Sequence, residues 1–385
     1  MTAIEAAAAL EARLEWRSSL AMHVDRLLVN PSALQADGRW LAAGEALAGT
    51  DEVSLDAAAW CQPAGQMPVE LAPDAFRPRV EMVTGRFYPR LAFGGLLGNT
   101  RDLRPLRLLA AGSATACWRL DPNHPLAAAG ARLSLRHAQH AAAPGIRLVE
   151  LFDGPGMQVP PADPVGAYFS EGSFARQDPA DDAGFYSVPR LTQHLDAQCR
   201  ADIAALYGRL LQPGMKVLDL MSGGDSHLPG IPGGLQVSGL GMNAAEMDTN
   251  PHLTERRVQD LNSTATLPWP DGSFDAVLCT ASIEYLVRPA QVLSEVKRVL
   301  RPGGVLAISF SDRWFPTKAI RVWTEIHPFE RMGLVLSLLQ QSGFEGLNTE
   351  SLRGTRRPDD DKYTGRRSFA DPLFAVWGHS GKPDG

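Results

Sequence analysis

The chain has 385 residues, about two and a half times the ~150 residues of a typical domain, which predicts more than one domain. With 44% hydrophobic and 21% charged residues, its composition is that of a globular protein and excludes a chain that is disordered throughout. The net charge of −6 excludes the strongly basic surface that favours nucleic acid, so no nucleic-acid partner is expected.

Cysteine usage and hydropathy predict a cytoplasmic protein. Cys61, Cys117, Cys199 and Cys279 stand apart, without CxxC or CxxH spacing, so neither a bound metal nor a disulfide framework is expected. No stretch approaches about 18 uncharged apolar residues, and the N-terminus has no basic segment ahead of an apolar one. We therefore expect no membrane span and no export.

The first half of the chain divides into two textures. Residues 1–37 place leucines such as Leu10 and Leu14 among charges at roughly helical spacing, which predicts short amphipathic helices. Residues 38–150 instead contain short alternating apolar and polar runs between Gly, Pro and Asn, typical of half-buried strands. These runs are VEMVTGRFY, RPLRLLA, ATACWRL and ARLSLRH. We predict a smaller, mainly β domain here.

Residues 151–183 are rich in proline and glycine, which disfavours long helices and central strands and predicts a linker. From residue 184 to 385 compact apolar strands alternate with helical patterns. The expected strands are 217–221, 235–241, 274–279 and 304–310, with helices at 191–211 and 289–300. This alternation predicts an α/β domain with a doubly wound parallel sheet, which binds ligands at the carboxyl ends of its strands.

The most specific string in the chain is LPWPDGSFDAVLCTASIEYLVRPAQVLSEVKRVLRPGGVLAISF, residues 267–310. It resembles class I S-adenosylmethionine-dependent methyltransferases, in the branch that includes the ubiquinone and menaquinone methyltransferases. The resemblance covers roughly residues 185–345. It implies a Rossmann-like fold, S-adenosyl-L-methionine as cofactor, and methyl transfer to a small-molecule acceptor.

The cofactor loop matches the family only in part. In the string DLMSGGD, Asp219 and Gly223 fit the family's pattern, whereas Met221 and Asp225 stand where glycines are usual. Gly241 stands where the family has an acidic residue that binds the ribose, so the usual ribose clamp is missing. Asn243 either replaces it or caps a helix through its Asn-x-x-Glu pattern with Glu246.

Asp260 resembles the Asp at the end of the family's third strand, which accepts from the adenine amino group; the alternative is a turn residue. The segment before the first strand commonly folds over the pocket in this family. His194 within it is our candidate general base, because its ordinary pKa suits neutral pH. The predicted cofactor residues are Asp219, Met221, Ser222, Gly223, Gly241, Met242, Asn243, Asp260, Leu261, Thr280, Tyr186 and Arg190.

Two C-terminal segments have other predicted roles. Residues 311–318 follow the last parallel strand on the ligand face and are expected to form an acceptor wall. Residues 353–367 mix arginines with Asp359, Asp360 and Asp361. This mixture either grips an anionic substrate or forms a solvated loop, and we favour the loop.

The N-terminal half carries one recognisable turn. The string DPNHPLA, residues 121–127, followed by ARLSL, looks like the closing motif of SlyD-type FKBP prolyl isomerases. The Ile-Pro-Gly-Leu segment that builds much of the isomerase pocket is missing from this half. The resemblance therefore implies a degenerate FKBP-like domain, used for recognition or homodimer contact, with His124 as a turn residue.

Together these features predict N-terminal helices over 1–37, an FKBP-like β domain over 38–150, a linker over 151–183 and a methyltransferase domain over 184–385. The predicted function is methyl transfer from S-adenosylmethionine to a small molecule. One alternative is a noncatalytic FKBP/methyltransferase-like binding scaffold, supported by the altered Met221, Asp225 and Gly241. The other is a folding helper with prolyl isomerase activity.

Overall fold

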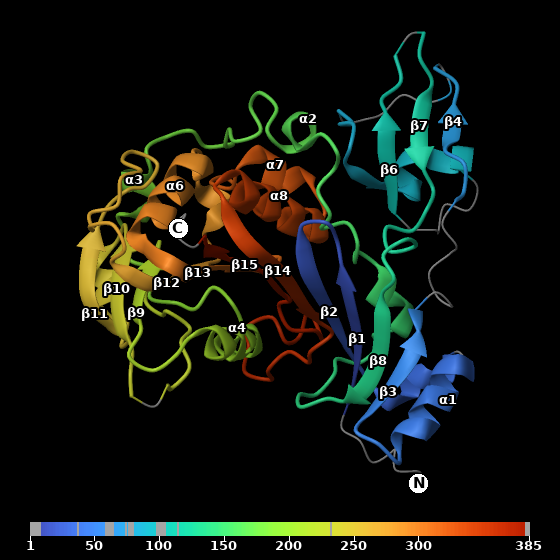
Figure 1. The fold of residues 1–385 in the computed structure, drawn as a ribbon, viewed down its shortest axis with the longest axis horizontal. Helices are drawn as coiled ribbons and strands as arrows, with labels where there is room; N and C mark the ends of the chain where they lie inside the picture. The colour runs from blue at the N-terminus through green and yellow to red at the C-terminus, as the bar shows by residue number, and fades with distance from the viewer. Residues whose placement is uncertain are drawn as a thin grey trace.

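The structure is a computed structural model that describes residues 9–36, 38–57, 65–73, 75, 81–97, 105–113, 115–231 and 233–381; Cys61 and the first eight residues lie outside these ranges. One sheet of eleven strands crosses the molecule in the order β11-β10-β9-β12-β13-β15-β14-β2-β1-β8-β3 (Figure 1). No helix among the described residues is long and apolar enough to cross a membrane.

The C-terminal half contributes seven neighbouring strands of this sheet. The first five strands of this half, β9 to β13, run parallel, and β15 lies antiparallel between β13 and β14. The predicted alternation of strands and helices is therefore confirmed, and the topology is Rossmann-like with a mixed edge. The strands are β9 Lys216–Leu220, β10 Gln236–Gly241, β11 Leu253–Val258, β12 Phe274–Thr280, β13 Leu300–Phe310, β14 Phe344–Arg353 and β15 Leu373–Ser380.

Helices cover both faces of these strands. On one face α6 buries Val292, Val296 and Val299, whose spacing places them on one side of the helix. On the other face α4 buries Cys199 and Ile203 against a separate core. The helices of this half are α3 Asp182–Tyr186, α4 Ala197–Leu210, α5 Ala244–Asp248, α6 Pro289–Val299, α7 Arg321–Glu325 and α8 Pro328–Gln341.

The predicted N-terminal helices are wrong. Residues 10–29 form a hairpin of two antiparallel strands, β1 Leu10–Arg17 and β2 Ala21–Val29, followed by a short 3-10 helix at Pro31–Ala36. The leucines that suggested a helical spacing also fit a period of two, since Leu10, Ala12, Leu14 and Trp16 are all buried. The strand period prevails because this alternation buries one face of β1 against a third core.

The hairpin joins the sheet of the C-terminal half. β2 pairs in parallel with β14, from Ala21 on Leu347 to Leu27 on Arg353. β1 then pairs with β8, and β3 completes the edge. The sheet thus continues across the predicted boundaries, although independent folding of either half stays a prediction.

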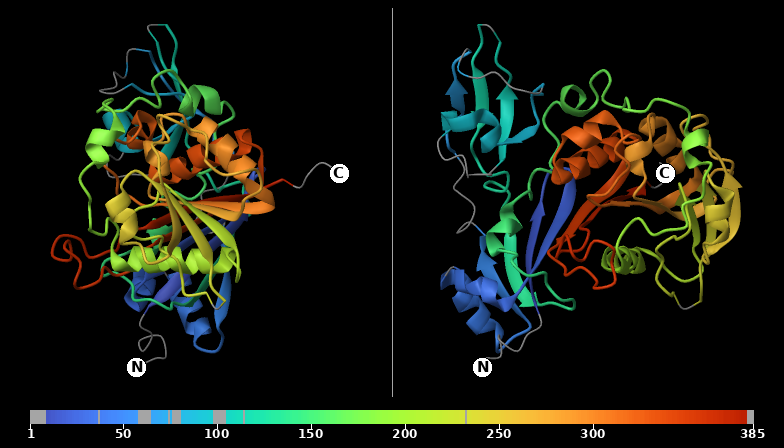
Figure 2. Two further views of the ribbon diagram at one scale, coloured as in Figure 1. Left: turned by 90° about the vertical axis from the view of Figure 1, so that its left-hand side faces the viewer. Right: turned by 180° about the vertical axis from the view of Figure 1, so that it is seen from behind.

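The remaining N-terminal elements confirm the predicted β character of this region. A second sheet has the order β4-β7-β6-β5 and stands away from the main sheet (Figure 2). The FKBP-like identity of the region is not established by this arrangement. The elements are α1 Gly38–Leu47, β3 Glu52–Asp56, β4 Val69–Leu71, β5 Phe87–Pro89, β6 Pro105–Ala110, β7 Trp118–Asp121 and β8 Arg132–His137, with a 3-10 helix at Arg90–Leu97.

The segment 151–183 has no long helix or strand, as predicted, but its first residues are packed, whereas many of those after residue 161 are exposed. A 3-10 helix at Leu148–Phe152 leads into it, and α2 spans Pro164–Tyr168. Residues 154–158 are buried. A Cβ on Gly154, whose φ is +116°, would overlap the ring of Phe329. Here glycine serves close packing rather than flexibility.

Asp25 joins this segment and both halves of the chain. Its buried carboxylate accepts hydrogen bonds from Trp16 Nε1 (2.9 Å), Gln158 Nε2 (3.1 Å) and Ser351 Oγ (2.8 Å). Burial raises the pKa of Asp25, against the lowering effect of these donors and of Arg353. One side chain of β2 therefore holds β1, the packed segment and β14 together.

We predict that Asp25→Ala lowers the free energy of unfolding by about 3 kcal/mol or more, because each buried donor left without an acceptor costs about 1–3 kcal/mol. Chemical unfolding measures the change, with the exposed Asp51→Ala as control, expected within about 0.5 kcal/mol of the parent. An Asp25→Ala protein that unfolds like the parent would contradict this account of the junction.

Candidate functional site

A pocket of about 500 Å³ opens at the carboxyl ends of β9, β10 and β12. All the site residues predicted from the sequence line it, together with loops from 182–195 and 313–315. Those residues are Asp219, Met221, Ser222, Gly223, Gly241, Met242, Asn243, Asp260, Leu261, Thr280, Tyr186, Arg190 and His194. The shared edge follows from the parallel strands, whose carboxyl ends meet on one side of the sheet.

The loop after β9 is fixed from below by Asp219. Its buried carboxylate accepts hydrogen bonds from the hydroxyls of Ser222 (2.6 Å) and Ser226 (2.7 Å) through one oxygen, Oδ2. Burial raises the pKa of Asp219, against the lowering effect of these hydroxyls. Asp219 therefore shapes the loop that borders the pocket.

Strained backbone gathers at this pocket. Among the described residues, three that are not glycine have a positive φ: Met221 (61°), His227 (52°) and Ala281 (46°). All three line the pocket. Met221, which stands where the family's pattern has a glycine, thus takes a left-handed conformation at a cost of about 1–2 kcal/mol. Such strain is typically concentrated at functional sites.

Gly241 has no room for the acidic residue usual at its position. A Cβ there would overlap the carbonyl oxygen of Ser222, a backbone atom of the loop after β9. The amide of Ser222 also donates to the carbonyl of Leu240 (2.8 Å), which holds the loop against the end of β10. The missing ribose clamp is therefore a consequence of how closely the loop packs.

Asn243 is a helix cap in this structure. Its Oδ1 accepts from the amide of Glu246 (3.1 Å) at the start of α5, and its Nδ2 donates to the carbonyl of Tyr186 (2.9 Å). Of the two roles considered for this side chain, capping is the one observed. Glu246 completes no reciprocal box, since its Oε1 accepts from the amide of Arg190 (2.6 Å) instead.

Glu246 is a pocket residue, although its sequence pattern indicated only that it would pair with Asn243 in a helix cap. It lines the pocket, and its Oε2 lies 3.6 Å from where a Cβ of Gly223 would be. Its place in the first turn of α5, five residues after Gly241, was the available signal. A carboxylate therefore reaches this side of the pocket from α5 rather than from β10.

Two residues of the segment 185–190, Tyr186 and Arg190, line the pocket. The guanidinium of Arg190 lies over the ring of Phe185 (4.3 Å) and near that of Phe315 (5.3 Å). Its Nη2 donates to the carbonyl of Phe185 (2.9 Å), while its Nη1 is buried without a hydrogen-bond partner. Burial raises the pKa of Tyr186, on the same segment, well above its usual value. Arg190 thus lines the pocket and carries one nitrogen without a hydrogen-bond partner.

Asp260 lies just after β11 and forms a turn while lining the pocket. Its Oδ1 accepts from the amide of Asn262 (2.8 Å) and its Oδ2 from Ser263 Oγ (2.7 Å). Both roles considered for it are therefore compatible with its position. Thr280, at the end of β12, is held by a hydrogen bond with Tyr207 Oη (2.6 Å).

His194 borders the pocket with its ring edge-on to Phe315 (5.2 Å between centroids). Partial burial lowers the pKa of His194 below 6.5; Arg190, Lys362 and Arg313 lower it further, and Glu246 opposes them. The imidazole is therefore neutral at pH 7. No group of three or more His, Cys, Asp or Glu side chains that could hold a metal lies within the described ranges.

The hydrogen-bond donors and acceptors that line this pocket fit S-adenosylmethionine. The unpartnered Nη1 of Arg190 suits a carboxylate, and the carboxylates of Glu246 and Asp260 suit hydroxyl and amino groups. A volume of about 500 Å³ lies within the range of small-molecule sites, about 300–1,000 Å³.

Comparison with known proteins relates the C-terminal half of the chain to methyltransferases. Residues 228–308 match the family described as "Methyltransferase domain". The chain is 28% identical over 162 residues to the ubiquinone/menaquinone biosynthesis C-methyltransferase of Laribacter hongkongensis, which covers 39% of this chain and 64% of that protein. It is 33% identical over 102 residues to the demethylmenaquinone methyltransferase of Renibacterium salmoninarum, covering 25% of this chain and 41% of that one.

A third relative, the sterol 24-C-methyltransferase of Yarrowia lipolytica, is 32% identical over 122 residues, covering 29% of this chain and 32% of the relative. The chain thus spans less than two thirds of the length of each of these relatives. A crystallised S-adenosylmethionine-dependent methyltransferase from Aquifex aeolicus is 18% identical over 47% of this chain and 90% of that one, with a TM-score of 0.33. The strand order and the family match together identify the C-terminal half as a class I S-adenosylmethionine-dependent methyltransferase domain.

Proposed function

We propose that the protein transfers a methyl group from S-adenosylmethionine to a small-molecule acceptor at the pocket described above. The observation that carries this proposal is the gathering of Met221, His227 and Ala281, each in a left-handed conformation, around one pocket at the carboxyl ends of the parallel strands. A chain that kept this fold only as a scaffold would gain nothing from maintaining such strain.

Each part of the cofactor has a suitable partner in the pocket. We assign the methionine carboxylate to Arg190, whose Nη1 is free to donate. We assign the ribose hydroxyls to Glu246, because Gly241 has no side chain and Asn243 is engaged as a cap. The adenine amino group is assigned to Asp260, following the family resemblance.

When bound, S-adenosylmethionine would supply an electrophilic methyl carbon. A nucleophilic atom of the acceptor would bond to this carbon as the S–CH₃ bond breaks with its electrons on sulfur, and the acceptor's proton would pass to a base. The chain's own contribution is mainly positioning and the exclusion of water. Tyr186, Trp314 and Phe315 give the pocket an aromatic wall. His194, neutral at pH 7, is the proposed acceptor of the proton.

The alternative is a noncatalytic scaffold, and its evidence is the departure from the family's pattern at Met221, Asp225 and Gly241. Asp225 is engaged within the loop: its Oδ2 lies 3.1 Å from His227 Nδ1 and 3.4 Å from Arg200 Nη1. Burial would raise the pKa of Asp225, but His227 and Arg200 lower it overall. Cofactor binding decides between the two functions.

For the N-terminal half we propose a recognition or homodimer role, in keeping with its FKBP-like turn. The turn's polar groups serve the fold: His124 Nδ1 accepts from the amide of Leu126 (3.1 Å), and its Nε2 lies 3.0 Å from the carbonyl of Phe152. These contacts favour a structural role for His124 over a role in prolyl isomerase activity. We also propose that the protein is located in the cytoplasm, because Cys117, Cys199 and Cys279 are free thiols, as a reducing compartment would leave them.

The direct test is calorimetric titration with S-adenosylmethionine and S-adenosylhomocysteine. We expect both to bind, and Arg190→Gln to weaken binding about tenfold or more, because a hydrogen bond to a charged group contributes about 1.5–3 kcal/mol. The control is Arg257→Gln, on exposed β11, which should bind like the parent. Failure of the parent to bind either ligand at millimolar concentration would favour the scaffold. Unchanged affinity in a normally folded Arg190→Gln protein would refute the carboxylate assignment.

The close packing at Gly241 generates a second prediction. Gly241→Ala should destabilise the protein by about 1–3 kcal/mol and weaken S-adenosylhomocysteine binding, because the loop after β9 must move. Gly241→Asp, which introduces the acidic residue usual in the family, should do the same rather than strengthen binding. Gly230→Ala is the matched control, since nothing lies within 4 Å of its Cβ position. Tighter binding by Gly241→Asp would overturn this explanation.

The environment of His194 predicts its titration. Because burial and neighbouring cations lower its pKa, the midpoint of the titration should lie below 6.5. The neutral, basic form then predominates at pH 7 and is lost as the solution becomes more acidic. An NMR titration measures this, with the His194 signal assigned by its absence from His194→Gln. A midpoint at or above 6.5 would contradict this account of the environment of His194.

A further inference from the structure

A second and larger pocket, of about 860 Å³, opens beside the first, and we call it the arginine pocket. It is formed by residues 175–177, the loop and helix over 312–324, and residues 363–367. Five of its lining side chains are arginines, and Asp312 is the one carboxylate among them. The arginines are Arg176, Arg313, Arg321, Arg366 and Arg367.

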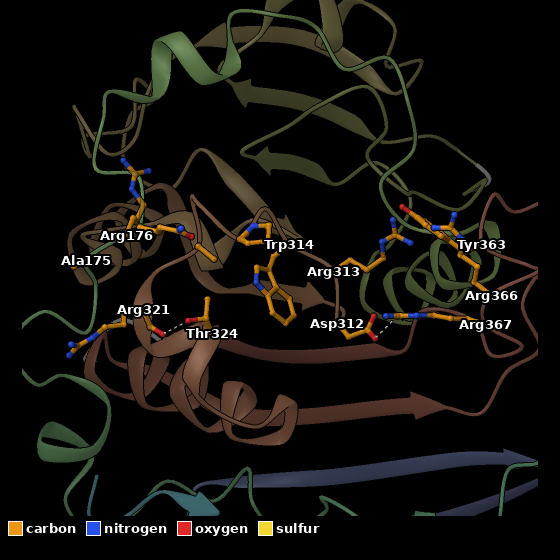
Figure 3. Close-up of a pocket in the computed structure, with 13 residues that line it drawn as sticks. Ala175, Arg176, Asp312, Arg313, Trp314, Arg321, Thr324, Tyr363, Arg366 and Arg367 are labelled. Carbon is orange, nitrogen blue, oxygen red and sulfur yellow. Dashed lines mark hydrogen bonds and ion pairs between the residues drawn. The ribbon is translucent and has the colours of Figure 1, made fainter. Parts of the chain in front are cut away.

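The arginines stand in two groups with a flat ring between them. Figure 3 shows Arg176 and Arg321 at one end, Arg313, Arg366 and Arg367 at the other, and Trp314 in the middle. The guanidinium of Arg331, which does not line this pocket, lies over the ring of Trp314, 4.1 Å from its centroid. The pocket therefore offers a fixed aromatic surface flanked by positive charge.

Several of these charges are only weakly compensated. Asp371 binds Arg357 at 2.7 Å but Arg313 at only 3.4 Å. Glu325 binds Arg86 at 2.8 Å but Arg321 at 3.6 Å. These carboxylates are therefore engaged more closely by arginines outside the pocket.

The other three arginines differ among themselves. Arg176 is fully paired with the buried Asp182 (2.7 Å), so it contributes little free charge. Arg367 lies 3.4 Å from Asp312, whose other carboxylate oxygen, Oδ1, is buried without a hydrogen-bond partner. Arg366 is exposed and has no ion pair with any residue that the structure describes. The net character of the pocket is positive.

The arginine pocket adjoins the cofactor pocket. Arg313 and Trp314 line both. A molecule seated on Trp314 would thus border the space assigned to the cofactor. The predicted acceptor wall over 311–318 is this shared boundary, and Arg366 and Arg367 come from the segment that the sequence predicted to be a solvated loop.

We propose that the arginine pocket binds the methyl acceptor, and that the acceptor is a small molecule with a flat apolar body and at least one carboxylate or phosphate group. Guanidinium groups bind such anions through paired, charge-assisted hydrogen bonds. Trp314, between the two groups of arginines, gives the flat body an aromatic surface to stack on. The ring of Tyr363 already lies under the guanidinium of Arg313, 4.6 Å from its centroid. The acceptor role rests on the proposed function.

The test measures the binding of 4-hydroxybenzoate, its neutral methyl ester and phenyl phosphate to the full chain by calorimetry, with and without S-adenosylhomocysteine. We expect at least one anion to bind at least tenfold more tightly than the ester. Tighter binding of phenyl phosphate would identify a phosphate as the recognised group, and tighter binding of 4-hydroxybenzoate a carboxylate.

The double variant Arg321→Gln/Arg366→Gln should weaken anion binding about tenfold and leave the ester unchanged. Neither residue lines the cofactor pocket, so S-adenosylhomocysteine affinity should be unaffected. The matched control is Arg356→Gln, an exposed arginine of the same C-terminal segment that does not line the arginine pocket.

Equal binding of anions and ester, no anion binding, or an unchanged double variant would overturn the proposal. If S-adenosylhomocysteine still binds in that case, the proposed methyl transfer stands and only the acceptor class is wrong. If an anion binds but S-adenosylhomocysteine does not, the pocket is an anion site and its acceptor role fails together with the proposed function.

Discussion

The cofactor pocket depends on one buried carboxylate. Asp219 accepts hydrogen bonds from Ser222 and Ser226, two residues of the loop after β9. The amide of Ser222 in turn holds this loop against the end of β10. Two departures from the family's pattern follow from this single constraint. Met221 takes a conformation that glycine adopts more easily, and Gly241 has no room for a side chain. The altered loop is therefore a compact version of the site rather than a collection of unrelated losses.

The continuous sheet explains how the two halves relate to this site. β2 pairs with β14, which is the strand of the C-terminal half on the side away from β9 and β10 (Figure 1). Asp25 on β2 stabilises this junction through its hydrogen bond from Ser351. No lining residue of either pocket precedes Ala175. The described N-terminal residues therefore stabilise the sheet without contributing to the chemistry of the pockets, which leaves their surfaces free for the recognition or dimer role that we propose.

The arrangement of the C-terminal half was predictable because its strands are compact apolar runs and its turns are marked by glycine and proline. Asp219, Gly241 and Asp260 could be placed in one pocket because parallel strands end at a common edge. The N-terminal hairpin was missed because Leu10 and Leu14 fit a period of four as well as a period of two, and only pairing with β14 and β8 decides between them.

The side-chain roles were less predictable than the fold. Asn243 fitted two roles in the sequence, and its contact with Tyr186, 57 residues away, requires the tertiary structure. The position of Glu246 depends on the same kind of long-range contact, with the amide of Arg190. The arginine pocket does too, because Arg176 and Arg366 are far apart in the sequence. Mixed charges over 353–367 indicate solvent exposure when read locally, and only the folded chain brings two of these arginines into the pocket that Trp314 also lines.

A crystal structure of the protein with S-adenosylhomocysteine tests the central claim most directly. The account predicts the ligand along the carboxyl ends of β9 and β10, its carboxylate on Arg190 and its ribose hydroxyls on Glu246. A ligand bound elsewhere, or one in this pocket that touches neither Arg190 nor Glu246, would contradict it.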